Sequence, residues 1–270
     1  CVHWCVMVLM SGVCAAATVQ MPAPERETRR EQPSRMAKPA LAVGATLDAH
    51  GGLWLAWVEN QQLRVSRSVD DGLSFSPPVT VTPEPENIAA NGENRPAIAV
   101  AKDGAVLVSW VQSLPQRFTA NVRFARSHDN GKTFSSPVTL NDDGRVAGHS
   151  FVSLALDGDG RVALVWLDGR DRDAARAKGG TFAGSSLYAA LSTDNGVSFS
   201  ANRAMATHTC ECCRTALAWS PRGPVALWRH LYDGGIRDFA LAYLDDGMVH
   251  RASEDAWRIE ACPHHGGGIA

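Results

Sequence analysis

One eight-residue motif occurs three times in this chain of 270 residues, with the form Ser-x-Asp-x-Gly-x-Ser/Thr-Phe. The copies begin at Ser68, Ser127 and Ser192, about 60 residues apart. A motif that returns at a nearly fixed spacing indicates an array of similar supersecondary units, which bury their apolar faces against one another. The recurring positions are Ser68, Asp70, Gly72, Ser74 and Phe75; Ser127, Asp129, Gly131, Thr133 and Phe134; and Ser192, Asp194, Gly196, Ser198 and Phe199.

Each copy of the motif is expected to form a tight turn between two strands. An alternating run such as residues 63–66 precedes a copy, and another such as residues 78–81 follows it. The aspartate carboxylate can accept hydrogen bonds from turn N–H groups, and the glycine can adopt a positive φ. We therefore assign these aspartates a structural role in the turn.

A second set of repeats lies upstream of these motifs. Four apolar runs end in Trp57, Trp110, Trp166 and Trp228, which are 53 to 62 residues apart, and a further apolar run precedes each of them. Together with the strand after the motif, each unit then holds four antiparallel strands, which is the content of one β-propeller blade. The sequence predicts an all-β fold, a β-propeller of four-stranded antiparallel blades, with about four blades present.

The motifs and their spacing resemble the Asp boxes, or BNR repeats, of the sialidase superfamily. The resemblance covers residues 38–270. Because sialidase propellers usually have six blades, it implies a six-bladed domain, truncated here at the C-terminus. The resemblance is informative for the fold and much less so for the function, because the same boxes occur in many proteins that are not sialidases.

Blade connectivity predicts which loops form the ligand-binding face. In such propellers, the link from an outer strand to the next inner strand shares a face with the loop between the second and third strands, and the Asp boxes lie on the opposite face. Ionisable and thiol side chains crowd the predicted face: Lys38, Glu59, Arg95, His149, Asp168, Arg170, Asp171, Cys212, Cys213, Arg214, Arg229, His230, Tyr232, Arg237, Asp238, His264 and His265.

The sialidase resemblance implies an arginine cluster that holds a sugar carboxylate, a tyrosine nucleophile paired with a glutamate, and an aspartate as acid/base. Arg95 and Pro96 resemble a sialidase arginine followed by proline. Two features depart from the family pattern, because Lys38 stands at the matching place of the first blade and the family's nucleophile comes in later blades. The candidate catalytic residues are Arg95, Asp168, Arg170, Arg229, Tyr232 and Arg237.

These residues lead to two alternative functions. The first is an exo-glycosidase that acts on sialic-acid-type or other acidic glycans. The second is a non-catalytic propeller that binds a ligand or a metal, with the arginines in salt bridges between blades. In either case the expected partner is a glycan or a small acidic ligand, and we expect a monomer.

The cysteines point to a second kind of site. Cys210, Cys212 and Cys213 lie within four residues, and Cys262 and His264 occupy the equivalent place before the next inner strand. In an exported protein, four cysteines favour two disulfides, whose pairing the sequence leaves open. The same cysteines with His264 would also suit copper or zinc, so the metal site remains the alternative.

The N-terminal residues and the composition indicate an exported protein. Residues 1–17 are almost wholly apolar and end in three alanines, which is typical of the remainder of a signal peptide, and residues 18–37 read as a disordered linker. The protein would then be periplasmic or extracellular, or a lipoprotein through Cys14, with no membrane span after signal removal. A formal net charge of -2 argues against a nucleic-acid partner.

Overall fold

The computed structural model describes residues 42–270. The predicted signal segment, the linker and Lys38 lie outside these residues, and the signal peptide and linker remain predictions. No helix among the described residues is long and apolar enough to cross a membrane.

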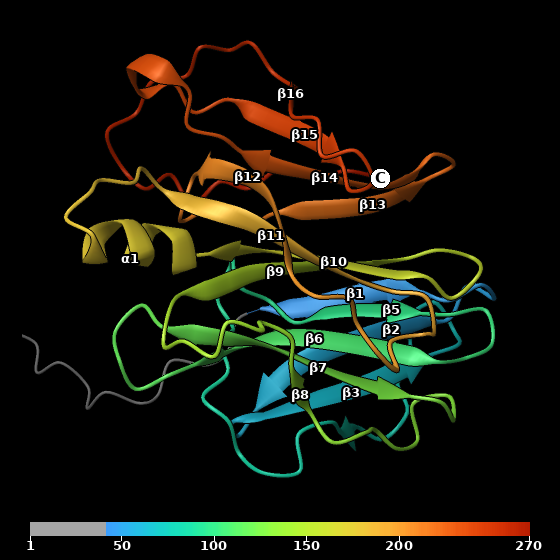
Figure 1. Cartoon of the computed structure of the whole chain (residues 1–270). Coiled ribbons are helices and arrows are strands. Elements are labelled where there is room, and N and C mark those ends of the chain that lie inside the picture. The colour runs from blue at the N-terminus through green and yellow to red at the C-terminus, as the bar shows by residue number, and fades with distance from the viewer. Residues whose placement is uncertain (1–41) are drawn as a thin grey trace, which may run out of the picture. The chain divides into compact units, whose positions relative to one another are not determined.

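The described chain folds into four four-stranded antiparallel sheets, each made from consecutive strands (Figure 1). The first sheet comprises β1 (Val43–Leu47), β2 (Leu53–Glu59), β3 (Gln62–Ser68) and β4 (Val79–Thr80); the second comprises β5 (Ala97–Val100), β6 (Val106–Ser113), β7 (Ala120–Ser127) and β8 (Val138–Thr139). The third comprises β9 (His149–Leu156), β10 (Val162–Asp168), β11 (Ser185–Ser192) and β12 (Arg203–Thr209); the fourth comprises β13 (Ala216–Ser220), β14 (Gly223–Arg229), β15 (Phe239–Tyr243) and β16 (His250–Arg251).

The first strands of the four sheets lie next to one another. Strand β1 contacts β5, β5 contacts β9, and β9 contacts β13, so these strands form the inner edge of the array and β4, β8, β12 and β16 form its outer edge. Four sheets that radiate from a shared inner edge are the blades of a propeller. The predicted all-β propeller of four-stranded blades is therefore confirmed.

The four repeated tryptophans all lie in the second strand of a blade. In the first three blades each tryptophan follows, by four positions, the residue that pairs with the motif serine: Leu53 with Ser68, Val106 with Ser127 and Val162 with Ser192. Trp110, Trp166 and Trp228 are fully buried, each packed against the preceding blade. Trp57 is only partly buried, since no other described blade covers the equivalent face of the first sheet.

The repeated motifs form the turns after β3, β7 and β11, with the same hydrogen bonds in each. In the second blade the Ser127 hydroxyl donates to Asp129 Oδ1 at 2.7 Å and accepts from the N–H of Gly131 at 2.9 Å. Asp129 Oδ1 also accepts from the N–H of Thr133 at 2.9 Å. Hydroxyl and N–H donors from Ser74, followed by the Ser68 hydroxyl, lower the pKa of Asp70 to about 2, and the corresponding donors lower the pKa of Asp129 and Asp194.

One helix interrupts the strand pattern. Helix α1 (Arg170–Ala177) lies between β10 and β11, where the sequence predicts only a loop, and a 3-10 turn, η1 (Asp233–Gly235), lies between β14 and β15. None of the residues of α1 is buried, so the helix has no apolar stripe from which periodicity could have predicted it. It begins directly after the buried end of β10 and brings its arginines to the edge of the third blade.

Candidate functional site

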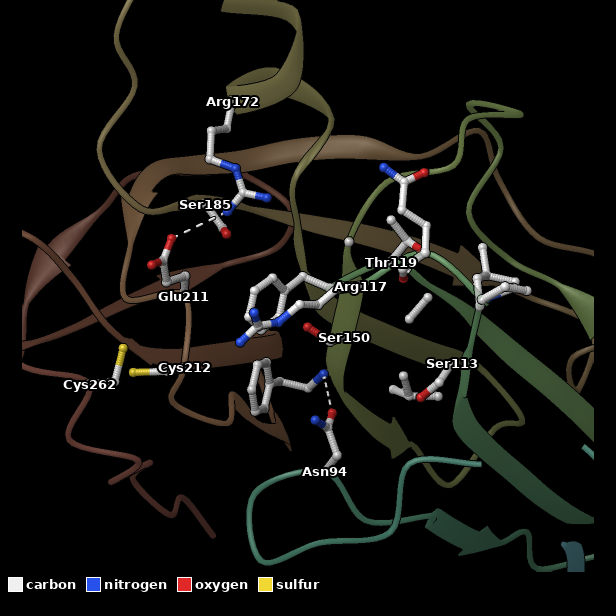
Figure 2. Close-up of a pocket in the computed structure, with 18 of the residues that line it drawn as sticks. Asn94, Ser113, Arg117, Thr119, Ser150, Arg172, Ser185, Glu211, Cys212 and Cys262 are labelled. Carbon is white, nitrogen blue, oxygen red and sulfur yellow. Dashed lines mark hydrogen bonds and ion pairs between the residues drawn. The ribbon is translucent and has the colours of Figure 1, made fainter. Parts of the chain in front are cut away.

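A pocket of about 690 Å³ opens at the ends of the second, third and fourth blades (Figure 2). Its wall is formed by the β6–β7 loop, by residues on either side of the start of β9, by α1, and by two segments that carry Cys212 and Cys262. These are the two loop classes that blade connectivity assigns to the ligand-binding face. The motif turns contribute no residue to this pocket.

The charged side chains of the pocket are mostly cationic. Arg117 comes from the β6–β7 loop, Arg172 and Arg176 come from α1, and Glu211 is the one carboxylate among the lining residues. The guanidinium of Arg172 forms an ion pair with Glu211 at 3.3 Å across the wall. Arg117 lies over the ring of Phe118, 4.5 Å from the ring centroid, and neither Arg117 nor Arg176 has a carboxylate partner among the described residues.

The backbone of the wall is held in an unusual conformation at Phe151. This residue has φ of 57°, in the left-handed region, and the pairing of β9 with β10 shifts register beside it. Asn94 Oδ1 accepts a hydrogen bond from the Phe151 N–H at 2.8 Å (Figure 2). Left-handed conformations of large residues persist where their surroundings hold them, and they concentrate at ligand sites.

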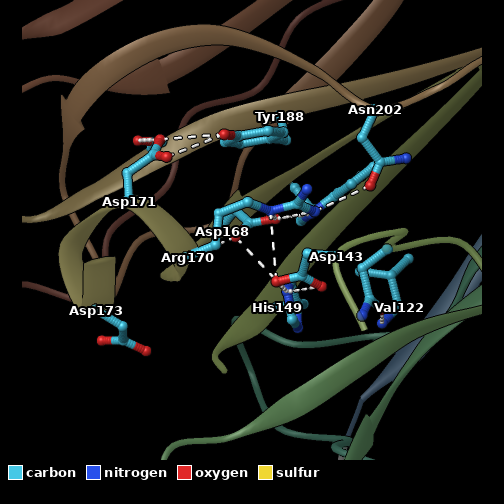
Figure 3. A network of polar contacts seen from close by, with 12 residues as sticks. Val122, Asp143, His149, Asp168, Arg170, Asp171, Asp173, Tyr188 and Asn202 are labelled. Atoms are coloured by element: carbon cyan, nitrogen blue, oxygen red, sulfur yellow. Dashed lines mark hydrogen bonds and ion pairs between the residues drawn. The ribbon is translucent and has the colours of Figure 1, made fainter. Parts of the chain in front are cut away.

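Arg170, the first residue of α1, lies at the centre of a network of polar side chains (Figure 3). Its guanidinium contacts Asp168 at 2.9 Å, Asp142 at 2.9 Å and Asp143 at 3.7 Å, and it donates to Asn202 Oδ1 at 2.9 Å. Burial by itself lowers the pKa of Arg170, but the hydrogen bonds and negative charges of these aspartates outweigh burial and raise that pKa above its usual value. Arg170 is therefore committed to internal carboxylates, with no free edge for a ligand.

Asp168 is fully buried and accepts hydrogen bonds from two sides of the network. The indole N–H of Trp166 donates to Asp168 Oδ2 at 2.9 Å, and the backbone N–H of Arg170 donates to Oδ1 at 2.9 Å. His149 lies beside it, with Nε2 3.6 Å from Asp168 Oδ1 and 3.3 Å from Asp143. Since Nδ1 of His149 lies 2.7 Å from the Ala120 carbonyl, that nitrogen carries the proton and donates.

Tyr188 belongs to the same network and was not singled out by the sequence. Its hydroxyl donates to the two oxygens of Asp171 at 3.1 and 3.2 Å, and the Arg170 guanidinium lies 4.3 Å from its ring centroid. Burial, followed by the charge and hydrogen bond of Asp171, raises the pKa of Tyr188 to about 12. A raised pKa disfavours the free phenolate, so the phenol keeps its proton, which it shares with Asp171.

Arg229 and Arg237 meet in the fourth blade, where protein groups satisfy both of them. Arg229 is buried and donates to the carbonyl of His265 at 3.1 and 3.2 Å, and its guanidinium lies over the rings of Phe239 and Trp257. Arg237 donates to the carbonyl of Ile259 and, at 3.1 Å, to the sulfur of Cys210. Neither guanidinium lines the pocket.

The remaining candidate catalytic residues lie apart from each other. Arg95 is exposed and its nearest polar contact is the Gly92 carbonyl at 3.5 Å. Tyr232 packs on His230 and under the Arg251 guanidinium, and burial raises its pKa. The structure thus does not bring the six candidates together at the pocket: Arg95, Asp168, Arg170, Arg229, Tyr232 and Arg237 all lie outside its lining.

The cysteine segments lie side by side, as their equivalent positions before adjacent inner strands predict. The His265 N–H donates to the sulfur of Cys213 at 3.4 Å, and the thiols of Cys212 and Cys262 point toward each other at the pocket wall (Figure 2). All four cysteines in the described residues are free, so the predicted disulfides are not formed in this structure. The sulfur of Cys210 lies 3.7 Å from that of Cys212 and 3.5 Å from that of Cys213, and a disulfide would need about 2.05 Å.

Burial and hydrogen bonding shift the pKa values of the three clustered thiols in different directions. The hydrogen bond from Cys213, assisted by the Arg237 guanidinium, lowers the pKa of Cys210 to about 5 despite its burial. Burial raises the pKa of Cys212 to about 12, and the contact with Cys210 raises the pKa of Cys213. His208 and His264, which flank the cluster, both have left-handed backbone conformations, with φ of 56° and 47°.

Glu93, in the loop before β5, ties together segments that are distant in sequence. Its carboxylate accepts hydrogen bonds from the Arg214 N–H at 2.9 Å and from the Gly266 N–H at 3.2 Å, and pairs with the Arg214 guanidinium at 3.1 Å. These contacts join the loop before the second blade to the residues that directly follow Cys213 and His265.

No protein-family model matches the chain, and no curated protein matches it in sequence. Solved structures do match. The α-L-arabinofuranosidase Arb93A from Fusarium graminearum is 15% identical with a TM-score of 0.56, over 83% of this chain and 69% of that one. An ulvan lyase of polysaccharide lyase family PL25 is 13% identical with a TM-score of 0.51, over 77% of this chain and 54% of that one.

The Hadza microbial sialidase Hz136 is 17% identical with a TM-score of 0.49, and the matched part is 78% of this chain and 46% of the sialidase. This chain therefore spans less than half the length of that sialidase and about two thirds of the arabinofuranosidase. At these identities the likeness shows the fold alone, and by its fold this chain is a β-propeller like the arabinofuranosidase and the ulvan lyase.

Proposed function

We propose that this chain is a glycan-acting propeller that binds an acidic sugar in the pocket between the β6–β7 loop, α1 and the cysteine segments. The observation that carries the proposal is the excess of guanidinium groups: Arg117, Arg172 and Arg176 line the pocket against one carboxylate, Glu211. An arginine can hold a sugar carboxylate with two parallel charge-assisted hydrogen bonds.

Two structural neighbours with TM-scores above 0.5 support a carbohydrate ligand. One is an arabinofuranosidase solved with an iminosugar inhibitor, and the other is an ulvan lyase bound to a glucuronate-containing glycan. Hydroxyl and amide groups of Ser150, Ser185 and Asn94 lie at the same wall and supply hydrogen bonds of the kind that a sugar ring needs. Export to the periplasm or the cell exterior would place the protein where polymeric glycans occur.

The lining residues suit an acidic sugar as ligand, but they do not include the nucleophile of a sialidase reaction. A sialidase-type reaction needs a tyrosine nucleophile, and among the described residues Tyr188, Tyr232 and Tyr243 lie outside the pocket lining. Glu211, held by Arg172, is the one lining carboxylate available for proton transfer. We therefore place the sugar carboxylate against Arg117 and Arg176, and Glu211 beside the bond that would react.

Calorimetric titration with matched oligosaccharides tests the proposal. Uronate-containing and sialylated oligosaccharides should bind, neutral arabino-oligosaccharides should bind at least tenfold more weakly, and added salt should weaken only the acidic ligands. Arg117→Ala and Arg176→Ala should each weaken acidic ligands about ten- to a hundredfold, the value of a charge-assisted hydrogen bond. Arg95→Ala, an exposed arginine outside the pocket, is the control. Equal binding of neutral and acidic ligands would refute the proposal.

Analysis of the products distinguishes hydrolysis of the glycan from elimination. A new reducing end without unsaturation indicates hydrolysis, whereas an unsaturated uronate indicates elimination. Glu211→Gln should abolish either reaction while leaving binding within a few-fold of the parent. Binding without turnover by the parent chain would identify a non-catalytic glycan-binding propeller, the alternative that the sequence leaves open.

A further inference from the structure

Three buried sulfurs are arranged like the donor atoms of a metal site. Cys210, Cys212 and Cys213 are each at most 5% exposed, and their sulfur atoms all lie within 4.8 Å of one another. The two shortest separations are 3.5 and 3.7 Å. Two sulfurs bound at 2.3 Å to one tetrahedral ion would lie about 3.8 Å apart, so the observed spacing needs almost no adjustment to hold an ion.

Two of the three sulfurs also receive a hydrogen bond from an N–H group. Arg237 Nη1 donates to Cys210 at 3.1 Å, and the backbone N–H of His265 donates to Cys213 at 3.4 Å. N–H donors stabilise negative charge on sulfur, and metal-bound thiolates are commonly surrounded by such donors. Neutral thiols packed only for their apolar surface would not require such donors.

A fourth ligand is available from the segment that packs against this cluster. The thiol of Cys262 faces that of Cys212 at the pocket wall (Figure 2), and the His265 N–H of the same segment donates to Cys213. Cys262 is exposed, so it can approach or leave the three buried sulfurs without disturbing the blade core. Three buried sulfurs and one exposed sulfur thus form a set of ligands that suits a thiophilic ion.

We propose that Cys210, Cys212 and Cys213, completed by Cys262, bind one thiophilic d¹⁰ metal ion, Zn²⁺ or Cu⁺, in the wall of the pocket. Soft thiolate donors select these ions over Mg²⁺ or Ca²⁺. A bound cation would offset the mutual repulsion that the three sulfurs acquire when they lose their protons to become metal ligands. This site goes beyond the proposed glycan function, and the metal can bind whether or not the sugar assignment holds.

Metal content and X-ray absorption of the purified full chain test the site. In separate titrations with Zn²⁺, and with Cu⁺ supplied under reducing conditions, at least one of the two ions should bind with a stoichiometry of one per chain. The ion that binds more tightly is then assigned to the site. The absorption spectrum should show three or four sulfur neighbours at about 2.3 Å. Fewer than three sulfur neighbours, or no binding of either ion at micromolar concentrations, would overturn the proposal.

Substitutions locate the ligands and separate a fold defect from a lost site. Cys213→Ser should lower metal affinity at least a hundredfold, because it breaks the buried three-sulfur cluster, whereas Cys262→Ser should lower it about tenfold, because it leaves that cluster intact. His250→Ala, an exposed histidine on β16, is the control and should bind metal like the parent. If Cys213→Ser does not fold, the Cys262→Ser spectrum decides the matter, since the loss of one sulfur neighbour is expected there.

Disulfide formation is the competing outcome. Alkylation of the metal-free chain, followed by peptide mass spectrometry, should label all four cysteines from Cys210 to Cys262 if they are metal ligands. A Cys212–Cys262 or Cys210–Cys213 disulfide that persists in the purified chain and prevents metal uptake would refute the metal site.

Discussion

Gly131, in the turn after β7, lies directly against the indole ring of Trp54 in the preceding blade. A Cβ atom added to Gly131 would lie 2.7 Å from Trp54 Cζ3, and the residue has φ of 75°. The third blade repeats the relationship, where a Cβ at Gly196 would lie 2.7 Å from Phe124 Cζ. The glycine of the motif therefore serves two purposes: it allows the turn, and it lets the turn approach the neighbouring blade.

Gly131→Ala should consequently destabilise the protein more than the same change in the first blade. Gly72 has a similar φ of 86°, but a Cβ there would meet only Leu53 at 3.6 Å, an ordinary contact. We expect Gly72→Ala to cost about 1 kcal/mol for the left-handed backbone and Gly131→Ala about 2 to 4 kcal/mol, because the turn must also move away from Trp54. Urea unfolding of the two variants measures the difference, and equal losses would contradict the docking role.

The motif aspartates should make stability fall in acid. A carboxyl group whose pKa is depressed by folding contributes stability above its unfolded pKa of about 3.9, and this contribution is lost as the pH falls through the folded value. For Asp70 that value is about 2. The thermal midpoint should therefore fall between pH 4 and 2, and less steeply in Asp70→Asn. An unchanged slope in this variant would show that the aspartate titrates normally in the folded chain.

Asp168→Ala should be strongly destabilising, because it removes a fully buried carboxylate from Trp166, His149 and Arg170. Breaking a buried pair from one side typically costs about 3 to 5 kcal/mol. Asp142→Ala is the matched control, since its side chain is 44% exposed and contacts the same guanidinium; its loss should be about 1 kcal/mol or less. Denaturant unfolding checks both, and similar losses would argue against burial as the cause.

Tyr188 of the third blade and Tyr232 of the fourth should respond to substitution by phenylalanine in opposite directions. The Tyr232 hydroxyl is buried and has no hydrogen-bond partner within residues 42–270, so Tyr232→Phe should raise the free energy of unfolding by about 1 kcal/mol. Tyr188→Phe should lower it by about 1 kcal/mol, because Asp171 loses a donor. Glycan turnover, where present, should survive Tyr232→Phe; its loss would restore Tyr232 as a catalytic candidate.

The fold could be predicted because its signals are local and repeated. The turn of each motif is specified within eight residues, and the tryptophans fix the register of the second strands, so blade connectivity then predicts which loops meet at the pocket. The adjacency of the Cys210 and Cys262 segments follows from the same equivalence.

The roles of individual arginines could not be predicted, since their partners come from distant segments. Arg170 binds Asp142 and Asn202, which lie 28 and 32 residues away and on different connections. Arg229 is enclosed by Phe239 and Trp257, whose ring planes no sequence pattern reveals. The pocket arginines of α1 were missed because a short helix without a buried face leaves no hydrophobic periodicity.

The contacts of Glu93 have a consequence for the order in which this molecule folds. The strands of each blade contact one another within one repeat. Glu93, by contrast, contacts Arg214 and Gly266, which follow it in the sequence by 121 and 173 positions. Closing such long loops costs more chain entropy and is slower than forming hairpins. The blades can thus be complete while the binding face is still open, so a ligand that needs the finished pocket reports on the last step of folding.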